Sequence, residues 1–365
     1  MTDRAFSWFL PTGGDGHHIG AVTSVQARSE AATERAATVD YLSQVARTAE
    51  SAGFSSLLTP VGLGCVDPWV VTSAVAPTTS TISYLVALRP GLASPTLVAQ
   101  QAATFARLTG GRIALNVVTG GDPVEQRAYG DPLDHAARYA RTAEFLTVVR
   151  GLLRGETVTF SGQHIQVEGA ALVDVPDVPP EIYLGGASAA ALEIAASQVD
   201  TYLSWVEGWD AALARRTVVV DRARERGRSV RFGLRLHVIA RETSAEAWAH
   251  TDDLLAGLDE AAIAASQARF ARMDSVAQRE MTALHGGRRA RLEVDQGLWA
   301  GAGLVREGAA TALVGSYDEV ADRIVALLGE GVDELVLSGW PHLEEAQRFG
   351  QHVRPRVEER LRSRW

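Results

Sequence analysis

The chain has 365 residues, of which 46% are hydrophobic and 22% are charged, so its composition indicates a folded globular protein with a large core. Its formal net charge of −9 at pH 7 argues against nucleic acid or an anionic membrane as the main partner. Every basic side chain apart from histidine is arginine and the single cysteine is Cys65, which excludes a catalytic lysine, an intrachain disulfide and a cysteine metal cluster.

The sequence contains no candidate membrane span. No apolar run reaches the length of about 18 residues that a membrane helix needs. The N-terminus lacks the charged-then-apolar pattern of a signal peptide. We therefore expect a cytoplasmic protein.

The first third of the chain alternates between strand-like and helix-like segments. After the first strand, residues 22–37 are small and polar and are expected to form a surface excursion. The expected strands are 6–10, 54–59, 82–88 and 113–118, and the expected helices are 39–51, 68–76 and 95–108. Each strand is followed at short spacing by a helix, which is typical of parallel βα units.

The alternation continues to the C-terminus. Residues 119–133 are expected to form a long loop, and 157–167 a small hairpin. The further expected strands are 181–184, 201–204, 231–240 and 333–337, and the further helices are 135–153, 188–197, 211–225, 244–273 with a break near 258, 317–328 and 343–361. Eight strands that alternate with helices predict a (β/α)₈ TIM barrel. No repeat or linker suggests a second domain, so residues 1–365 are expected to form one.

Residues 274–315 fit no strand–helix pair. The segment is rich in glycine and arginine and lies between the seventh and eighth strands. A long connection in a compact domain is usually functional or mobile. We interpret it as an insertion that forms a mobile lid, and a plain surface insertion is the alternative.

The expected strand 231–240 carries an unusual pair of side chains. Arg235 and His237 are two residues apart and so share one face, whereas the opposite face is apolar. Burying a guanidinium costs several kcal/mol unless it is paired, so this face is expected to line a polar cavity. An edge strand with a solvated face is the alternative.

In a TIM barrel the active site lies at the carboxyl ends of the strands. The expected residues there are rich in arginine, histidine, tryptophan and glycine: His17, His18, Cys65, Arg89, Asn116, Thr119, Gly185, Gly186, Ser188, Trp205, Arg235, His237, Trp340 and His342. Neither a carboxylate pair for glycoside hydrolysis nor a metal-ligand spacing is present. Arginines with few acidic neighbours favour an anionic ligand such as a phosphate, sulfonate or carboxylate. Residues 185–188 precede a helix, which suits a phosphate, although they are equally compatible with a tight turn.

Several longer motifs carry a resemblance to a known family. They are 8–17 (WFLPTGGDGH), 86–90 (VALRP), 94–96 (SPT), 116–123 (NVVTGGDP), 133–139 (LDHAARY), 235–237 (RLH), 298–306 (LWAGAGLVR) and 337–345 (LSGWPHLEE). The chain resembles, from about residue 6 to 350, the flavin-dependent two-component alkanesulfonate monooxygenases of the bacterial luciferase-like group. Several of these strings separate the sulfonate enzymes from other luciferase-like proteins.

The resemblance implies a reaction and a set of partners. A separate NAD(P)H-dependent FMN reductase would supply FMNH2, and O2 would be the co-substrate. The enzyme would oxygenate an organosulfonate at the carbon that bears sulfur and release sulfite and an aldehyde. A homo-oligomer, dimer or tetramer, is also expected.

The resemblance also assigns residues, by matching motif positions only. Arg235, His237 and Arg306 match the active-site arginines and histidine, with Arg306 on the lid. Trp205 and His342 match pocket residues, and Cys65 matches a cysteine near the flavin. Trp340 stands where the family has a tyrosine, and Trp340 and His342 are expected among the catalytic residues with Arg235, His237 and Arg306. The flavin ring and phosphate would be held by Asn116, His135, Tyr139, Gly185, Gly186 and Ser188. His237 suits proton transfer near neutral pH, with a core histidine as the alternative, and for Cys65 a packing role is the alternative.

Two departures from the family pattern affect the substrate. Trp340 replaces a tyrosine, which removes a hydroxyl and adds bulk, and Ala187 replaces a common serine, which removes a possible phosphate contact. The alternatives are therefore a luciferase-like oxygenase on another anionic substrate, such as the sugar sulfonate sulfoquinovose or a sulfone, and a non-catalytic flavin-binding protein. A deazaflavin-dependent dehydrogenase of the same fold lacks motif support.

Overall fold

The computed structural model describes residues 6–19 and 34–363. The surface excursion predicted over residues 22–37 lies mostly outside these described residues.

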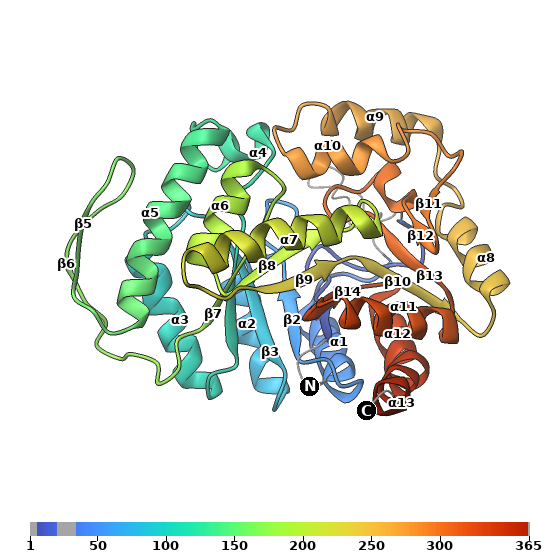
Figure 1. Ribbon diagram of the computed structural model, residues 1–365, viewed down its shortest axis with the longest axis horizontal. Coiled ribbons are helices and arrows are strands. Elements are labelled where there is room, and N and C mark those ends of the chain that lie inside the picture. The colour runs from blue at the N-terminus through green and yellow to red at the C-terminus, as the bar shows by residue number, and fades with distance from the viewer. Residues whose placement is uncertain (1–5, 20–33, 364–365) are drawn as a thin grey trace.

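Eight parallel strands close into a barrel, which confirms the predicted (β/α)₈ fold (Figure 1). Around the barrel the order is β1-β14-β9-β8-β7-β4-β3-β2. Their bounds are β1 Phe6–Phe9, β2 Ser56–Thr59, β3 Ser83–Leu88, β4 Ile113–Val117, β7 Glu181–Gly185, β8 Thr201–Trp205, β9 Arg231–Arg235 and β14 Glu334–Leu337. Each of them overlaps one of the eight predicted strands.

The strands are buried on both faces, so apolar residues occur at nearly every position. One cluster, Leu58, Leu85, Tyr183, Leu203 and Val336, fills the barrel interior. The alternate residues, such as Leu57, Tyr84 and Leu335, belong to the larger cluster that packs the barrel against its helices. A barrel of this size is a packed core, which leaves function to the loops at the strand ends.

Helices surround the barrel, and most begin at a side chain that caps the free N–H groups of the first turn. They are α1 Val39–Ser51, α2 Pro68–Val75 with a short 3₁₀ turn at Ala76–Thr78, α3 Pro95–Thr109, α5 His135–Leu153, α6 Ala189–Gln198, α7 Trp209–Glu225 and α11 Tyr317–Gly329. The capping residues include Thr38 for α1, Ser94 for α3 and Ser188 for α6.

Two expectations about helices need correction outside the insertion. The predicted loop 119–133 contains helix α4 (Pro123–Ala128), capped by Asp122. The predicted helix 343–361 is divided into α12 (His342–Arg348), a π-helical turn (Phe349–Val353) and α13 (Arg354–Ser363). The hairpin, β5 (Val158–Ser161) with β6 (Gln166–Ala170), is present and extends away from the barrel (Figure 1).

The predicted strand 231–240 is two strands. β9 ends at Arg235, and β10 (His237–Arg241) leaves the barrel and pairs with β13 (Ala312–Ser316). The change of partner occurs at one residue: Leu236 N–H donates to Val336 O at 3.2 Å, and His237 N–H donates to Thr311 O at 2.8 Å. Arg235 and His237 therefore lie at the junction of two sheets.

The insertion, which fitted no strand–helix pair in the sequence, has regular structure of its own. It contains α10 (Val276–Ala283), β11 (Glu293–Asp295), β12 (Leu298–Trp299) and a 3₁₀ turn (Gly301–Leu304), and ends in β13. β11, β12, β13 and β10 form a four-stranded sheet. α8 (Ser244–Leu254) and α9 (Glu260–Phe270) precede it, with the predicted break between them. In Figure 1 α9 and α10 lie beside α4, at the end of the barrel where β4 ends.

Side chains and backbone atoms join the start of the insertion to the barrel. Arg138 of α5 donates to both carboxylate oxygens of Asp274, at 2.6 and 2.8 Å. The backbone N–H of Asp274 donates to Gly121 O, after β4, at 3.0 Å. The insertion is therefore attached to the βα loops that surround the expected site.

Candidate active site

Arg235 ends strand β9 as a buried guanidinium with 7% of its surface exposed. Its Nη1 donates to Leu236 O at 2.8 Å and, weakly, to Val336 O at 3.4 Å. Its Cζ lies 5.0 Å from the centre of the Phe9 ring. Burial, and then the charge of Arg306, lower the pKa of Arg235 from its ordinary value to about 9. No carboxylate of the described residues forms an ion pair with it, which is unusual for a buried arginine.

His237 begins strand β10 and is buried with both ring nitrogens engaged. Nε2 lies 2.8 Å from Ala309 O, and because a carbonyl only accepts, Nε2 carries the proton. Nδ1 is then the acceptor for the Ser338 hydroxyl at 2.5 Å. Burial, followed by the charge of Arg235, holds the pKa of His237 well below 6.5. The expected proton transfer by His237 near neutral pH is disfavoured in this state.

Trp340 lies after β14, between the two sheets. Its ring centre is 4.0 Å from that of His237, and the guanidinium carbon of Arg306 lies 5.4 Å from the ring centroid. The indole is almost fully buried and its Nε1 has no hydrogen-bond partner. Arg306 follows the 3₁₀ turn of the insertion, and burial lowers its pKa against the opposing effect of Cys65, Glu307 and Asp15.

His342 begins helix α12 and is held by a buried carboxylate. Its Nδ1 lies 2.8 Å from Asp15 Oδ1, and its backbone N–H donates to Asp15 Oδ2 at 2.8 Å. The Tyr41 hydroxyl also donates to Oδ2. Burial alone would raise the pKa of Asp15, but the charge and hydrogen bonds of His342, with the Tyr41 bond, lower it to about 2. The His342 ring lies 5.6 Å from that of Phe9.

A second group of residues lies at the start of helix α6. Ser188 caps the helix, and the Tyr139 hydroxyl of α5 interacts with Ser188 and Thr119. Gly186 has φ +130°, and a Cβ there would lie 2.8 Å from the Tyr139 hydroxyl oxygen, so only glycine lets this oxygen approach the backbone. The His135 ring lies 4.9 Å from Tyr139. Hydroxyls and the free N–H groups of a helix start suit a phosphate.

The remaining predicted residues lie at the same carboxyl ends of the strands. Trp205 ends β8 directly opposite Arg235 of β9, and a Cβ on Gly308 would lie 3.9 Å from its ring. Asn116 is buried in β4, and Gly185 ends β7. Cys65 is half-buried in the loop after β2, and its charge acts on Arg306.

The contacts join the predicted residues into two groups. The first contains Arg235, His237, Arg306, Trp340 and His342, and the second contains His135, Tyr139, Gly186 and Ser188. Sequence reasoning missed Asp15, which holds His342, and Ser338, which holds His237. The signal for Asp15 was its place in a glycine-rich loop directly after the first strand.

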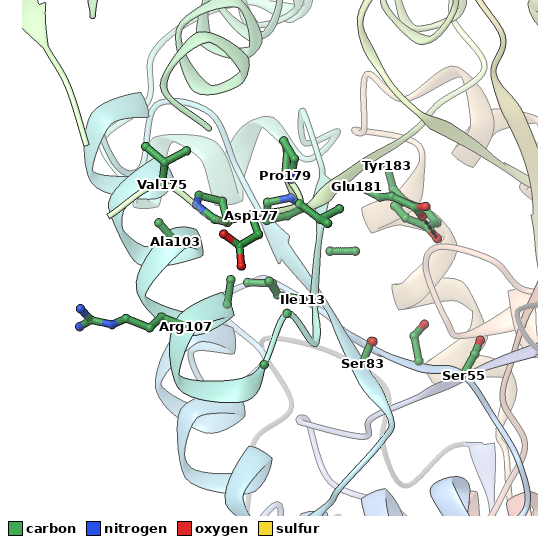
Figure 2. Close-up of a pocket in the computed structure, with 18 of the residues that line it drawn as sticks. Ser55, Ser83, Ala103, Arg107, Ile113, Val175, Asp177, Pro179, Glu181 and Tyr183 are labelled. Carbon is green, nitrogen blue, oxygen red and sulfur yellow. Dashed lines mark hydrogen bonds between the residues drawn. The ribbon is translucent and has the colours of Figure 1, made fainter. Parts of the chain in front are cut away.

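A cavity of about 690 Å³ lies at the opposite end of the barrel, where the strands begin (Figure 2). Ser55, Ser83, Ile113 and Glu181 line it from the barrel, and residues 174–180 cover its outer side. None of the predicted site residues lines it. Among the described residues no cluster of histidine, cysteine and carboxylate side chains fits a metal ion, and no helix is long and apolar enough to cross a membrane.

Comparisons with known proteins identify the family. Three solved structures share the fold. A riboflavin lyase solved with modified FMN and riboflavin is 18% identical over 98% of this chain and 92% of that one, with a TM-score of 0.79. The EDTA monooxygenase of Chelativorans sp. BNC1 is 20% identical over 98% of this chain and 94% of that one (TM-score 0.74), and a long-chain alkane monooxygenase is 20% identical over 99% and 92% of the two chains (TM-score 0.77). The model of the luciferase-like monooxygenase family matches residues 6–334. That match covers most of the barrel, so this chain belongs to the luciferase-like monooxygenase family.

Proposed function

We propose that this chain is the oxygenating component of a two-component system that uses reduced FMN and O2 to cleave the C–S bond of an organosulfonate. An NAD(P)H-dependent FMN reductase would supply the reduced flavin. The family membership supports flavin chemistry, and the resemblance of the motifs supports the sulfonate. The choice of a sulfonate as the substrate rests on the buried guanidinium of Arg235, which has no carboxylate partner among the described residues.

Arg235 is a buried cation without a carboxylate partner among the described residues, and the charge of a second arginine, the half-buried Arg306, acts on it. Two guanidinium groups in one desolvated site repel each other, and the lowered pKa of Arg235 is the sign of this cost. A bound anion would offset this repulsion between the two guanidinium groups. A sulfonate is ionised at every physiological pH, and its three oxygens accept the paired N–H groups of guanidinium.

The residues around the start of α6 fit a flavin phosphate. The Tyr139 and Ser188 hydroxyls and the positive end of the α6 dipole supply donors and charge of the right sign. Gly186 brings the backbone close to Tyr139, as a compact phosphate cradle requires. Bound there, reduced FMN would supply the electrons that activate O2 at the strand ends.

The overall reaction balances when the sulfonate, FMNH2 and O2 give an aldehyde, sulfite, FMN, water and one proton. Arg235 and Arg306 would hold the sulfonate, and the negative charge that grows on sulfite as the C–S bond breaks strengthens that contact. Trp340, packed between His237 and Arg306, would limit the room beside the sulfonate. One product proton needs an acceptor, and the site contains histidines for it.

The structural neighbours are compatible with an anionic substrate, because one of them is an EDTA monooxygenase and EDTA is a polyanion. A sugar sulfonate such as sulfoquinovose would use the same two arginines. A sulfone is neutral and would leave the arginine charges without a counter-ion, so the site favours a sulfone less than a sulfonate.

The test is sulfite release with FMN, NADPH and a reductase, across short and long alkanesulfonates, a sugar sulfonate and a neutral sulfone. We expect sulfite from at least one sulfonate and none from the sulfone. Arg306→Ala should lower kcat/KM about 30- to 1000-fold, because truncating one partner of a buried charged contact costs roughly 2–5 kcal/mol. Arg226→Ala, at a surface ion pair with Glu193, is the matched control. No sulfite from any sulfonate, with reduced FMN bound tightly, would remove the sulfonate proposal.

A further inference from the structure

Asp15 is a buried carboxylate that the proposed reaction has not yet used. Four donors surround it: the Nδ1–H and backbone N–H of His342, the Tyr41 hydroxyl and the N–H of Gly16, which is 2.9 Å from Oδ1. The side chain has no exposed surface. With its pKa lowered to about 2, Asp15 is ionised at any working pH.

An ionised Asp15 only accepts hydrogen bonds, which fixes the proton on His342. Nδ1 must carry a proton to bond Oδ1 at 2.8 Å, so in the neutral ring the lone pair is on Nε2. No described residue bonds Nε2. The ring neighbours on that side are apolar or aromatic: Phe9 at 5.6 Å and Trp340 at 6.4 Å between centroids.

The other polar groups of the site are poor proton acceptors. His237 uses Nε2 to donate to Ala309 O and Nδ1 to accept from Ser338, and burial keeps its pKa well below 6.5. Arg235 and Arg306 carry only N–H donors. His342 Nε2 is therefore the imidazole nitrogen placed to take a proton in this site.

We propose that Asp15 is a positioning residue that holds His342 in the Nδ1–H tautomer, so that Nε2 accepts the proton released when the oxygenated sulfonate breaks down. The inference rests on the proposed function. In the step, the hydroxyl on the carbon that bears sulfur gives its proton to Nε2, a C=O bond forms, and the C–S bonding pair leaves on sulfur as sulfite. No oxidant takes part in this step, because the carbon has already been oxidised.

The hydrogen bonds of Asp15 predict what an isosteric amide would do. Oδ2 accepts from both the His342 backbone N–H and the Tyr41 hydroxyl, and in the Asp15→Asn rotamer that keeps both of these bonds the NH2 group takes the place of Oδ1 and gives up the Gly16 N–H bond. The NH2 group then faces Nδ1 of His342 and donates to it. The ring is forced into the Nε2–H tautomer and loses its acceptor. The same change in serine proteases leaves the geometry intact and lowers kcat about 10⁴-fold.

The experiment compares wild type with Asp15→Asn by two readouts. ¹⁵N NMR of histidine-labelled protein, without flavin, shows which ring nitrogen of His342 carries the proton, and His342→Gln identifies its signal. Single-turnover sulfite release with reduced FMN gives the rate of the chemical step. Asp131→Asn is the matched control. Asp131 is also a buried carboxylate, but its partner is Arg141, at 2.5 Å, and not His342.

We expect Nδ1–H in wild type, Nε2–H in Asp15→Asn, and a rate about 10²- to 10⁴-fold lower in the variant with KM within threefold of wild type. Asp131→Asn should keep both the tautomer and the rate. An unchanged tautomer, or a rate within twofold of wild type, would overturn the inference. Absence of sulfite from wild type itself would instead refute the proposed function, and the NMR comparison would still decide the role of Asp15.

Discussion

His237 illustrates how a buried residue can match a catalytic motif and yet be held in a fixed structural state. Its ring contacts two other segments: Ala309 of the insertion through Nε2, and the loop after β14, where Ser338 bonds Nδ1 and the Trp340 ring packs at a tilt with its centre 4.0 Å away. Its protonation would reverse the Ser338 bond, with Nδ1–H as the donor, and add a third positive charge beside Arg235 and Arg306. The neutral ring therefore keeps the insertion aligned with the barrel.

This state predicts a pH dependence of stability. An unfolded histidine takes up a proton below about pH 6.5, whereas folded His237, with its pKa well below that value, does not. Its contribution is thus complete above pH 6.5 and falls as the pH drops, by up to about 1.4 kcal/mol per pH unit. Urea unfolding at pH 7.5, 6.5 and 5.5 should show this slope in wild type and a shallower one in His237→Gln. Equal slopes in wild type and His237→Gln would contradict the assignment.

At the scale of elements, α9 and α10 hold the segment that carries Arg306. The Gln267 amide donates to Gly303 O and Leu304 O at 3.0 and 2.9 Å. Arg269 pairs with Glu307 at 2.7 Å, and the N–H of Gly308 donates to the Gln278 amide oxygen at 2.9 Å. Three side chains from two short helices thus fix the backbone on both sides of Arg306. Closure of this segment over bound flavin stays a prediction.

Removing one of these contacts should loosen the segment selectively. Arg269→Met keeps the aliphatic packing but deletes the ion pair with Glu307, which is partly exposed and can be solvated, so the expected cost is about 1 kcal/mol. Amide hydrogen exchange over residues 303–309 should become about fivefold faster, while exchange in the barrel strand β7 stays the same. Uniform acceleration in both regions would show that Arg269 supports the whole fold and not this segment.

The errors of sequence reasoning at this scale have a common physical cause. The alternation of residues 231–240 runs unbroken through Leu236, but hydrogen bonds to Val336, Thr311 and Ser338 decide where the barrel strand ends. Such partners are distant in sequence and leave no local pattern. β11 and β12 have three and two residues, which is too short for a period to be recognised. Most of the eight barrel strands were predictable because they are buried apolar runs, several of them bounded by glycine or proline.

For the whole molecule, most of the candidate site could be located from the sequence, because the active site of a TIM barrel lies at the carboxyl ends of its strands. Arg235, Trp205 and Trp340 lie at or just after strand ends, and closing the barrel is enough to bring strand ends together. Asp15 was not predictable as the partner of His342, because the pair joins the first and last βα loops. The sequence analysis also expected few carboxylates at the strand ends, which drew attention away from Asp15. An acidic residue that positions a histidine is visible only in three dimensions.

Substitutions at the two ends of the barrel should change different properties. A change where the strands begin should alter stability, and a change where they end should alter turnover. At the end where the strands begin, beside the cavity of Figure 2, the Tyr183 hydroxyl donates to buried Glu334 at 2.9 Å, and burial raises the pKa of Glu334. Tyr183→Phe leaves that carboxyl with one donor fewer and should lower the free energy of unfolding by about 1–3 kcal/mol. Its kcat/KM for sulfite release should stay within twofold of wild type, because the reacting groups lie at the other end.

Arg306→Ala should show the reverse pattern, since it removes a half-buried cation from the site and relieves its repulsion of Arg235. We expect unchanged or slightly higher stability in urea, together with the loss of turnover. Measuring both quantities on both variants makes the comparison decisive. If Tyr183→Phe lost turnover and kept its stability, the chemistry would belong to the cavity where the strands begin, and the arginine site would have to be assigned another role.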